Sequence, residues 1–378
     1  MSNLIYYTYM FLLGFYISSL QFCVTKLNAG LGGFPWLLNV FITLHFVGSM
    51  LSPAVAGEIS DRLGKKPVLI GFSLSMMAGM VLLATHATAF IAGAGILMIG
   101  ASLSAMEGQM SAVLAQLNPG KSDKVLNDSQ VFNCVGAVLG PIYMLLLEKS
   151  GGTWELGIWT AVLLFAGATV WLMKTPVPKA AHVSAPREKR TAYSGILLRN
   201  KLFLTILVAI FLYVAVEQGA AFYVNTLFPS GRAELAAFSL SGFWGGMIVL
   251  RFFTARFYRH ARKIMTASII SAVASLLLLQ AGISAYADAA LFILLGTSLA
   301  VMWPMLMSVC NQSFAECGGT ASGLMMMAGG LGGMAGPAGL SLFSFAGTHR
   351  AILLLAAGAL FIGLLWWRTV SMTKARNM

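Results

Sequence analysis

The chain carries twelve long apolar runs that are separated by short polar segments. A helix of about 20 apolar residues is long enough to cross the hydrocarbon core of a bilayer. Inside a bilayer every backbone N–H and C=O group must be hydrogen-bonded within the protein, so only helices and closed barrels span it. Barrel strands are about 10 residues long and alternate between polar and apolar residues, which these runs do not do. The sequence therefore predicts an all-α membrane protein with twelve transmembrane helices.

The composition supports this prediction. Hydrophobic residues make up 58% of the chain and charged residues 10%, against roughly 45–50% and 25% in soluble domains. The N-terminus lacks a basic region followed by a small-residue cleavage site, so we expect the first run to be retained as a span. The predicted spans cover residues 4–26, 36–58, 67–86, 88–116, 128–148, 154–173, 201–227, 235–255, 264–284, 288–312, 320–346 and 350–371.

The basic residues set the orientation. In a soluble protein a net charge of +12 would suggest a nucleic-acid partner, but here the Lys and Arg residues lie in the loops between spans. Loops on the cytoplasmic side of a membrane carry an excess of Lys and Arg. With both termini in the cytoplasm, 20 of the 24 Lys and Arg residues lie on that side, and the outward loops hold only Lys26, Lys149, Arg232 and Arg350. We therefore predict a multi-pass protein of the cytoplasmic (inner) membrane with both termini inside and no nucleic-acid partner.

The chain divides into two halves that resemble each other. A polar segment at 174–200, rich in Pro and basic residues, is predicted to be a cytoplasmic linker between six helices in 1–173 and six in 201–378. The pattern Gly-x-x-x-Gly-Pro at 136–141 recurs at 332–337, and the same offset carries Lys66 onto Arg262 in a second basic loop. Repeats at one offset are typical of a duplicated six-helix unit.

A short charged loop joins the second and third spans, with the sequence Gly57-Glu58-Ile59-Ser60-Asp61-Arg62-Leu63-Gly64-Lys65-Lys66-Pro67. Glycine permits a tight reversal, and an acid among basic residues can form charged pairs at the membrane surface or lie at a helix N-terminus. The loop resembles the signature loop of the major facilitator superfamily of secondary transporters. The resemblance implies two six-helix bundles around a central cavity, with the loop acid latching one conformation. The residues it implicates in gating are Gly57, Asp61, Arg62, Gly64, Lys65 and Lys66. The alternative is a loop that only sets topology.

Four further stretches narrow the resemblance to the branch that contains fucose–proton symporters and related sugar carriers. They are Ala105-Met-Glu-Gly-Gln109 with Leu126-Asn-Asp-Ser-Gln-Val-Phe132, then Tyr213-Val-Ala-Val-Glu-Gln-Gly219 with Tyr223-Val-Asn225, then Ser239-Leu-Ser-Gly-Phe-Trp-Gly-Gly246, and finally Ser298 with Trp303-Pro304. In proton-coupled carriers of that branch an Asp follows a first-span glycine by seven residues. Counting from Gly14 leads here to Gln21, which can hydrogen-bond a hydroxyl-rich ligand but cannot titrate.

Glu107 and Glu217 are the acids that stand well inside predicted spans. An ionised carboxylate near the bilayer centre costs several kcal/mol or more unless it is paired or faces water, so such acids usually have a function. We interpret both as candidate proton-coupling residues. The alternative is a permanently protonated acid that bridges two helices by hydrogen bonds.

Other polar and aromatic residues at membrane depth are candidates for contact with substrate. Aromatic faces stack on sugar rings and amides bridge hydroxyl groups, although Trp and Tyr also gather at membrane interfaces. The candidate substrate-binding residues are Gln21, Tyr16, Asn133, Tyr223, Asn225, Trp244, Trp303 and Asn311, and His45 is a further possible proton relay.

The sequence therefore favours a secondary active transporter that moves a small polar solute, sugar-like on resemblance, by proton-coupled alternating access. Two alternatives stay open: a drug or metabolite–proton antiporter on the same fold, favoured by the 22 methionines, and a non-transporting ligand sensor. No catalytic constellation, phosphate-binding loop or metal-ligand spacing is visible, so we expect no enzyme activity, no cofactor and no metal. We expect a monomer in contact with membrane lipid.

Overall fold

A computed structural model describes residues 3–86, 88–118, 122–177, 195–228, 232–256, 261–314, 318–343 and 348–376. In these ranges the regular elements are all α-helices, as the sequence predicts. Within the described residues, eleven stretches are long and apolar enough to cross a membrane. Each of the predicted spans overlaps a helix. Most of the predicted linker lies outside the described residues.

The chain separates into two compact units. Unit 1 holds Met1–His182 with Pro229–Trp244, and unit 2 holds Val183–Phe228 with Gly245–Met378. The helices before residue 182 are α1 (Leu4–Gly30), α2 (Pro35–Leu63), α3 (Lys65–Thr85), α4 (Ala89–Leu117), α5 (Ser122–Lys149) and α6 (Trp154–Lys174). The later helices are α8 (Lys201–Leu227), α9 (Ala233–Arg256), α10 (Ala261–Ala281), α11 (Ala285–Leu299), α12 (Met302–Ser313), α13 (Gly318–Phe343) and α14 (Thr348–Arg376).

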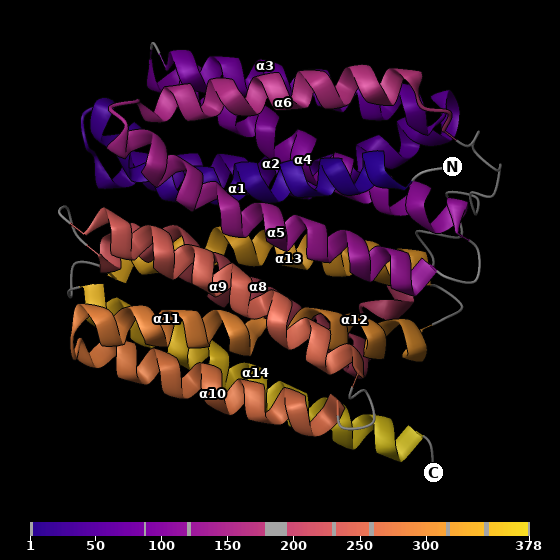
Figure 1. Ribbon diagram of the computed structural model, residues 1–378. Helices are drawn as coiled ribbons and strands as arrows, with labels where there is room; N and C mark the ends of the chain where they lie inside the picture. Colours follow the sequence, from indigo (N-terminus) through magenta and orange to yellow (C-terminus); the bar gives the residue numbers. More distant parts are fainter. Residues whose placement is uncertain are drawn as a thin grey trace. The chain divides into compact units, whose positions relative to one another are not determined.

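In unit 1, α1 packs on α5, α4 packs on both α2 and α3, and α3 packs on α6, as Figure 1 shows for α3 and α6. Three buried hydroxyl groups join α1, α3 and α6. The Tyr9 hydroxyl lies 3.1 Å from Ser73 Oγ and 3.0 Å from Thr169 Oγ1. Because lipid tails are as apolar as leucine, close packing and hydrogen bonds of this kind hold membrane helices together.

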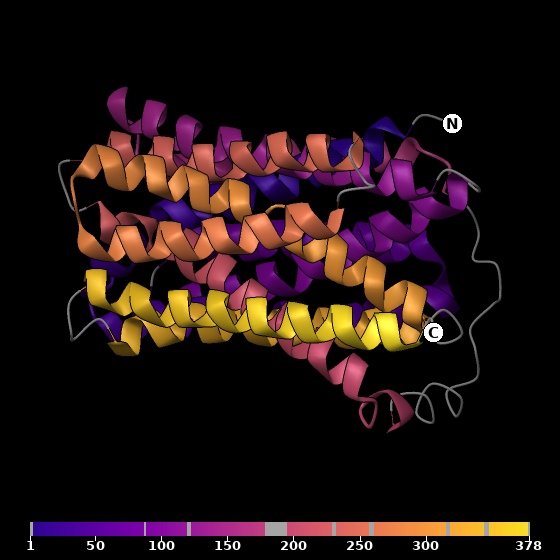
Figure 2. The same cartoon turned by 90° about the horizontal axis from the view of Figure 1, so that it is seen from below.

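In unit 2, α8 packs on α13 and α14, and α10 packs on α11 and α14. Figure 2 shows α14 as a long yellow helix that ends near the C-terminus. Ser298 Oγ on α11 donates a hydrogen bond to Ser271 Oγ on α10 at 2.8 Å. Unit 2 therefore has the same helix-only architecture as unit 1, with polar links between neighbouring helices.

The glycine–proline repeat forms an equivalent contact in each unit. A Cβ atom added at Gly136 would collide with the Phe11 carbonyl oxygen on α1, and one at Gly140 would lie 2.6 Å from the Phe15 carbonyl oxygen. In unit 2, Cβ atoms at Gly332 and Gly336 would collide with the carbonyl oxygens of Phe211 and Ala215 on α8, respectively. The repeated glycines thus allow α5 and α13 to approach the first helix of their unit backbone to backbone.

The charged loop between the second and third spans is shorter than the sequence suggests. Helix α2 continues to Leu63 and α3 begins at Lys65, so Gly64 alone separates the two helices. Gly64 has φ 87° and ψ 161°, a region of backbone conformation that is almost restricted to glycine. The expected tight reversal at Gly64 is therefore confirmed, and most of the remaining loop residues belong to helix ends.

The tenth predicted span, 288–312, is not one continuous helix. It divides into α11, which ends at Leu299, and α12, which begins at Met302. Pro304 has no N–H group and cannot donate to the carbonyl oxygen of Ala300, four residues earlier. Arg251 Nε on α9 donates to that carbonyl at 3.1 Å instead. A proline break in a membrane helix is tolerated when a neighbouring helix satisfies the freed backbone group in this way.

Candidate proton and substrate sites

Glu217 lies in the middle of α8 and its side chain is buried, with 8% of its surface exposed. The hydroxyl of Tyr213, one helical turn earlier, donates a hydrogen bond to Glu217 Oε2. The side-chain amide of Gln218 donates to Glu217 Oε1 at 2.8 Å. Residues four apart lie on the same helical face, which explains the first contact. Both oxygens of this carboxyl group therefore accept hydrogen bonds from α8 itself.

An aromatic residue from the broken tenth span joins this group. The ring centroids of Tyr213 and Trp303 lie 6.2 Å apart with planes tilted by 43°. A Cβ atom added at Gly329 on α13 would be 3.4 Å from Trp303, so the indole lies between α8 and α13. Unit 2 thus brings a buried acid, a phenol and an indole together beside the helix break at Ala300.

Glu107 lies on α4 in unit 1 and is half-buried. Gln130 on α5 donates a side-chain hydrogen bond to Glu107 Oε1 at 3.1 Å. Unlike the Glu217 contacts, this one joins two helices. The amide has two N–H groups and a carbonyl oxygen, so Gln130 can serve either the protonated or the ionised carboxyl group.

Most of the other candidates in unit 1 are buried, and Asn133 is half-buried. Gln21 and Tyr16 on α1 are fully buried. The Asn133 amide on α5 donates to the Met10 carbonyl oxygen at 3.1 Å, so in this structure it ties α5 to α1. Trp244, in the part of α9 that belongs to unit 1, is buried with its ring edge-on to Phe243. His45 on α2 is also buried, and its ring meets Phe46 edge-on.

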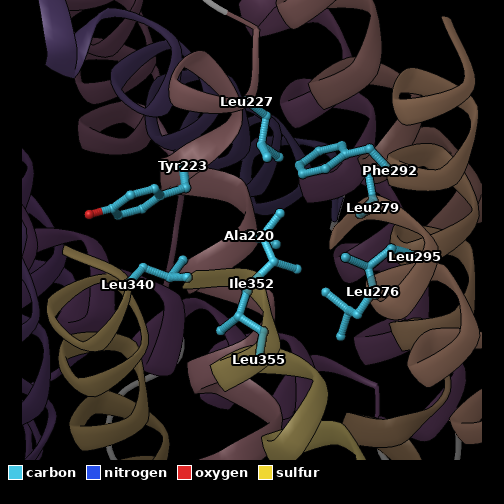
Figure 3. Close-up of a pocket in the computed structure, with 10 residues that line it drawn as sticks. All are labelled: Ala220, Tyr223, Leu227, Leu276, Leu279, Phe292, Leu295, Leu340, Ile352 and Leu355. Carbon is cyan, nitrogen blue, oxygen red and sulfur yellow. The ribbon is translucent and has the colours of Figure 1, made fainter. Parts of the chain in front are cut away.

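Tyr223 on α8 is buried and hydrogen-bonded to Ser341 on α13. It lines a small apolar cavity of about 10 Å³. Figure 3 shows the Tyr223 hydroxyl pointing away from the leucine and phenylalanine side chains around that space. The cavity is about the size of a single water molecule, so it is no substrate site. Asn225 is half-buried on the same helix, and the Asn311 side chain is not among those that the structure describes.

The gating candidates are described only in part. Gly57 lies in α2 and Gly64 forms the link to α3. The Lys66 ammonium group donates to the Met173 carbonyl oxygen near the end of α6 at 2.7 Å, and Lys65 is half-buried. The side chains of Asp61 and Arg62 lie outside the described residues, so the predicted latch by Asp61 stays a prediction.

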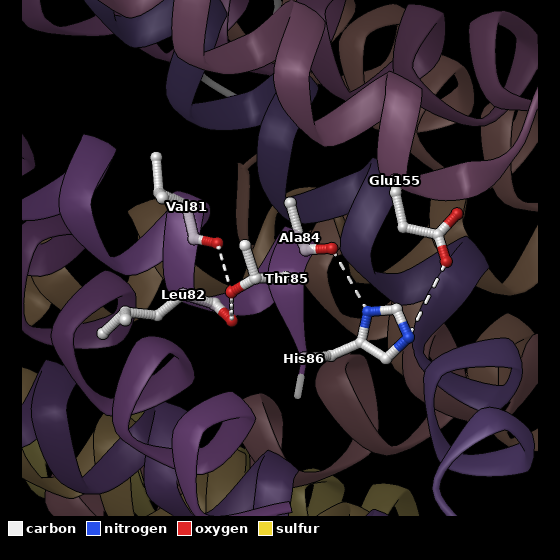
Figure 4. Close-up of polar contacts among 6 residues, drawn as sticks. All are labelled: Val81, Leu82, Ala84, Thr85, His86 and Glu155. Atoms are coloured by element: carbon white, nitrogen blue, oxygen red, sulfur yellow. Dashed lines mark hydrogen bonds and ion pairs between the residues drawn. The ribbon is translucent and has the colours of Figure 1, made fainter. Parts of the chain in front are cut away.

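Charged pairs occur at the helix ends that we predict to face outward. Lys26 on α1 pairs with Glu148 on α5, and Lys149 pairs with Glu234 at the start of α9 at 2.6 Å. Glu155 Oε1 lies 3.9 Å from His86 Nε2, and the same imidazole contacts the Ala84 carbonyl through Nδ1 at 3.2 Å, as Figure 4 shows. Glu148, Glu234 and Glu155 thus lie near helix ends, whereas Glu107 and Glu217 lie inside α4 and α8.

In the described part of the chain, no group of three or more His, Cys, Asp or Glu side chains is placed to hold a metal ion. Cys23, Cys134 and Cys310 are free thiols in buried positions. Burial is typical of free cysteines that pack as small apolar side chains.

Sequence reasoning missed the partners of the two acids. The contact between Tyr213 and Glu217 could have been predicted, because the two residues are four apart in a helix. The contact between Gln130 and Glu107 could not have been predicted in this way, because it joins two helices.

The sequence analysis also missed Asp288, which lies in the first turn of α11 and is buried. An acid near a helix N-terminus is favoured by the helix dipole, which gives Asp288 a structural reason to be there.

Known proteins share the fold over almost the whole chain. YfkL from Bacillus subtilis (strain 168), described as an uncharacterised MFS-type transporter, is 22% identical over 349 residues, which cover 87% of this chain and 86% of that protein. The E. coli fucose:proton symporter FucP superposes with a TM-score of 0.72 at 17% identity, over 97% of this chain and 98% of that one. The nucleoside transporter NupG gives a TM-score of 0.78 at 15% identity, over 97% and 99%.

FucP and NupG are named for different substrates, fucose and nucleosides. The structural similarity therefore shows the fold and does not identify the substrate of this chain. The sequence profile of the Major Facilitator Superfamily matches residues 1–337. This match covers well over half of the 378 residues. The chain belongs to the Major Facilitator Superfamily and is a multi-pass membrane transporter, not an enzyme.

Proposed function

We propose that this secondary transporter imports a small polar, sugar-like solute together with protons. Alternating access in this fold places the substrate near the middle of the membrane and moves one bundle against the other. A proton-coupled carrier needs a group at that depth that can hold and release a proton. Glu217 is our choice for this group, and Glu107 is the second candidate.

The observation that carries the proposal is the environment of Glu217. The carboxyl group is buried at the centre of α8, and its two oxygens are approached by Tyr213 and Gln218. An acid at membrane depth is costly unless it has partners or a function. Hydrogen bonds from the neutral Tyr213 and Gln218 side chains stabilise the carboxylate, and the Tyr213 hydroxyl can also accept a hydrogen bond from the acid form. Such a group can therefore exchange a proton during transport.

The position of this acid also supports a polar, ring-shaped cargo. Trp303 contacts Tyr213 and follows directly on the break between α11 and α12. Broken helices in transporters are typical of the region where substrate and coupling ions bind. An indole face packs well on a sugar ring, and the amide of Gln218 can bridge hydroxyl groups. Gln21 in unit 1 is proposed as a further hydroxyl contact.

The loop around Gly64 is proposed as the gate, with Gly57, Asp61, Arg62, Lys65 and Lys66. Lys66 already joins the start of α3 to the end of α6. In this proposal Asp61 changes its ionic partners when the two six-helix groups rock, so it affects the rate of exchange between conformations more than the binding of substrate.

The test is transport by the purified protein in liposomes under an imposed pH gradient, acid outside. A panel of labelled hexoses, deoxyhexoses and pentoses is compared with lipophilic cations. We expect accumulation of a sugar that requires the gradient, and exchange of the same sugar without a gradient. Accumulation of a lipophilic cation when the gradient is reversed would instead identify an exporter. Binding without any exchange would identify a sensor and contradict the proposed transport.

A further inference from the structure

A groove and a pocket meet on the surface of unit 2 and are not part of the sites described above. The groove runs between α10 and α14, which lie side by side in Figure 1, and has a volume of about 610 Å³. Its walls are apolar except at one end, where Arg262 and Thr266 stand. The pocket has a volume of about 420 Å³ and adjoins that end, since Arg262, Trp366 and Val370 line both spaces.

The two spaces differ in chemistry. The groove is lined by Ile269, Ile270, Val273, Ala274, Leu277, Leu360, Leu364 and Trp367. The pocket is lined by the polar residues Gln312, Ser313, Thr369 and Thr373 together with Arg262. No Asp or Glu lines either space. The combination is an apolar channel that leads to one cationic, hydroxyl-rich end.

The guanidinium group of Arg262 is available to a ligand. Arg262 lies in the first turn of α10, and its side chain is exposed. Among the residues that the structure describes, no acid forms an ion pair with it. A helix N-terminus adds partial positive charge at the same place. Arginine recognises phosphate groups through several N–H donors in a fixed plane.

The dimensions match one leaflet of a bilayer. Helix α10 rises about 1.5 Å per residue, so the groove from Arg262 to Leu277 is about 22 Å long. Half of the hydrocarbon core measures about 15 Å, which leaves several ångströms for a headgroup at the Arg262 end. Trp367, with 73% of its surface exposed, stands near that end, where tryptophan marks the interface between lipid and water.

We propose that this groove and pocket bind one anionic phospholipid, with its phosphate at Arg262 and its acyl chains between α10 and α14. The charge distribution of the sequence places the Arg262 end on the cytoplasmic side, where basic pockets between helices recognise anionic headgroups. This site is separate from the proposed proton and substrate residues. Its occupancy therefore does not depend on which solute the protein carries.

The experiment measures lipid binding to the full-length protein purified in detergent. Native mass spectrometry counts bound dioleoyl phosphatidylglycerol or dioleoyl phosphatidylcholine, and thermal unfolding is followed with each lipid. We expect one tightly bound phosphatidylglycerol and a larger rise in Tm than with phosphatidylcholine. One basic side chain near the headgroup contributes about 1 kcal/mol, so Arg262→Gln is expected to weaken phosphatidylglycerol binding about fivefold. Phosphatidylcholine binding is expected to change little.

Two further variants separate this site from general charge and packing effects. Ala274→Phe fills the exposed part of the groove and is expected to weaken binding while Arg262 remains. Arg368→Gln removes the same charge from an exposed position on α14 that lines neither space, so it is expected to bind phosphatidylglycerol like the wild type. If Arg262→Gln fails to fold, the comparison of Ala274→Phe with the wild type carries the test.

Several results would overturn the proposal. Equal binding of the two lipids by the wild type would mean that the groove does not recognise the headgroup. A loss in Arg368→Gln as large as in Arg262→Gln would assign the effect to net charge. Stabilisation by inorganic phosphate alone, equal to that by the lipid, would contradict the role of the groove. A lipid-free dimer that Ala274→Phe dissociates would identify a second copy of this chain as the occupant.

Discussion

Glu217 takes both of its described hydrogen bonds from its own helix, through Tyr213 and Gln218. The acid and its donors therefore move together as α8 moves, and the carboxyl group keeps these contacts in any arrangement of the two units. Glu107 is different, because its partner Gln130 lies on α5. Relative motion of α4 and α5 would change that contact. As the proposed proton carrier, Glu217 would thus keep these two donors while it binds and releases a proton, whereas the contact of Glu107 with Gln130 would change when the helices move.

Single glycines decide how closely helices pack. We predict that Gly336→Ala destabilises the protein, because its Cβ would collide with the Ala215 carbonyl oxygen on α8. Overpacking of this kind costs typically about 1–3 kcal/mol, so the Tm in detergent should fall by several degrees. The matched control is Gly323→Ala on the same helix, where an added Cβ meets nothing within 4 Å. It should be neutral or slightly stabilising, and an equal loss in both variants would contradict the packing account.

The placement of the two acids inside helices was predictable, because an acid within an apolar run is visible in any sequence. The position of Gln21 within α1 was predictable as well, because a polar amide also stands out within an apolar run. The use of Asn133 was not: its amide binds the Met10 carbonyl oxygen, and backbone partners on another helix leave no pattern in the chain. The sequence thus indicates which side chains are costly in a membrane, whereas only the fold shows what each one contacts.

At the scale of elements, the break between α11 and α12 is the clearest departure from the twelve predicted continuous spans. Pro304 was visible in the sequence, and its effect on the Ala300 carbonyl follows from the missing N–H group. What the sequence could not supply was Arg251, the donor from α9 that satisfies this carbonyl. The helix is broken where Pro304 leaves the Ala300 carbonyl without its usual donor and Arg251 from α9 donates to it.

This interpretation predicts an energetic coupling between Arg251 and Pro304. Arg251→Leu removes the donor to the Ala300 carbonyl and should destabilise the protein by about 1–3 kcal/mol. In the Pro304→Ala background the new N–H group can bond that carbonyl, so the same change should cost less. A double-mutant cycle on thermal unfolding measures the difference. Additive effects of the two changes would show that Arg251 acts through other contacts.

The backbone conformation of Gly64, the single residue between α2 and α3, leads to a second prediction at this scale. Gly64 has φ 87°, and a side chain in that region of backbone conformation costs about 1–3 kcal/mol. Gly64→Ala should therefore lower the Tm. Gly57→Ala is the matched control, since Gly57 lies within α2 and an added Cβ there meets nothing within 4 Å. A wild-type Tm for Gly64→Ala would mean that the link adapts without strain.

At the scale of the whole molecule, the two units share the same type of close helix contact at glycine residues. Helices α5 and α13 carry the repeated glycines, and each approaches the first helix of its unit, α1 or α8, at backbone distance. The offset repeat in the sequence predicted a duplicated element, and the equivalent contacts explain why glycine occupies those positions. Duplication does not extend to the acids, because the repeat offset of 196 residues relates Glu107 to Trp303 and Glu217 to Gln21. The two units are alike in packing and differ in their candidate chemistry.

The most direct test of proton coupling is the proton movement that accompanies substrate in liposomes loaded with a pH-sensitive dye. We predict that Glu217→Gln exchanges substrate in counterflow but takes up no protons with it, because glutamine keeps the shape and hydrogen bonds of the acid and cannot titrate. Glu155→Gln, which removes an acid near a helix end, should keep the wild-type proton movement. Proton uptake by Glu217→Gln equal to that of the wild type would contradict the central role of this carboxyl group.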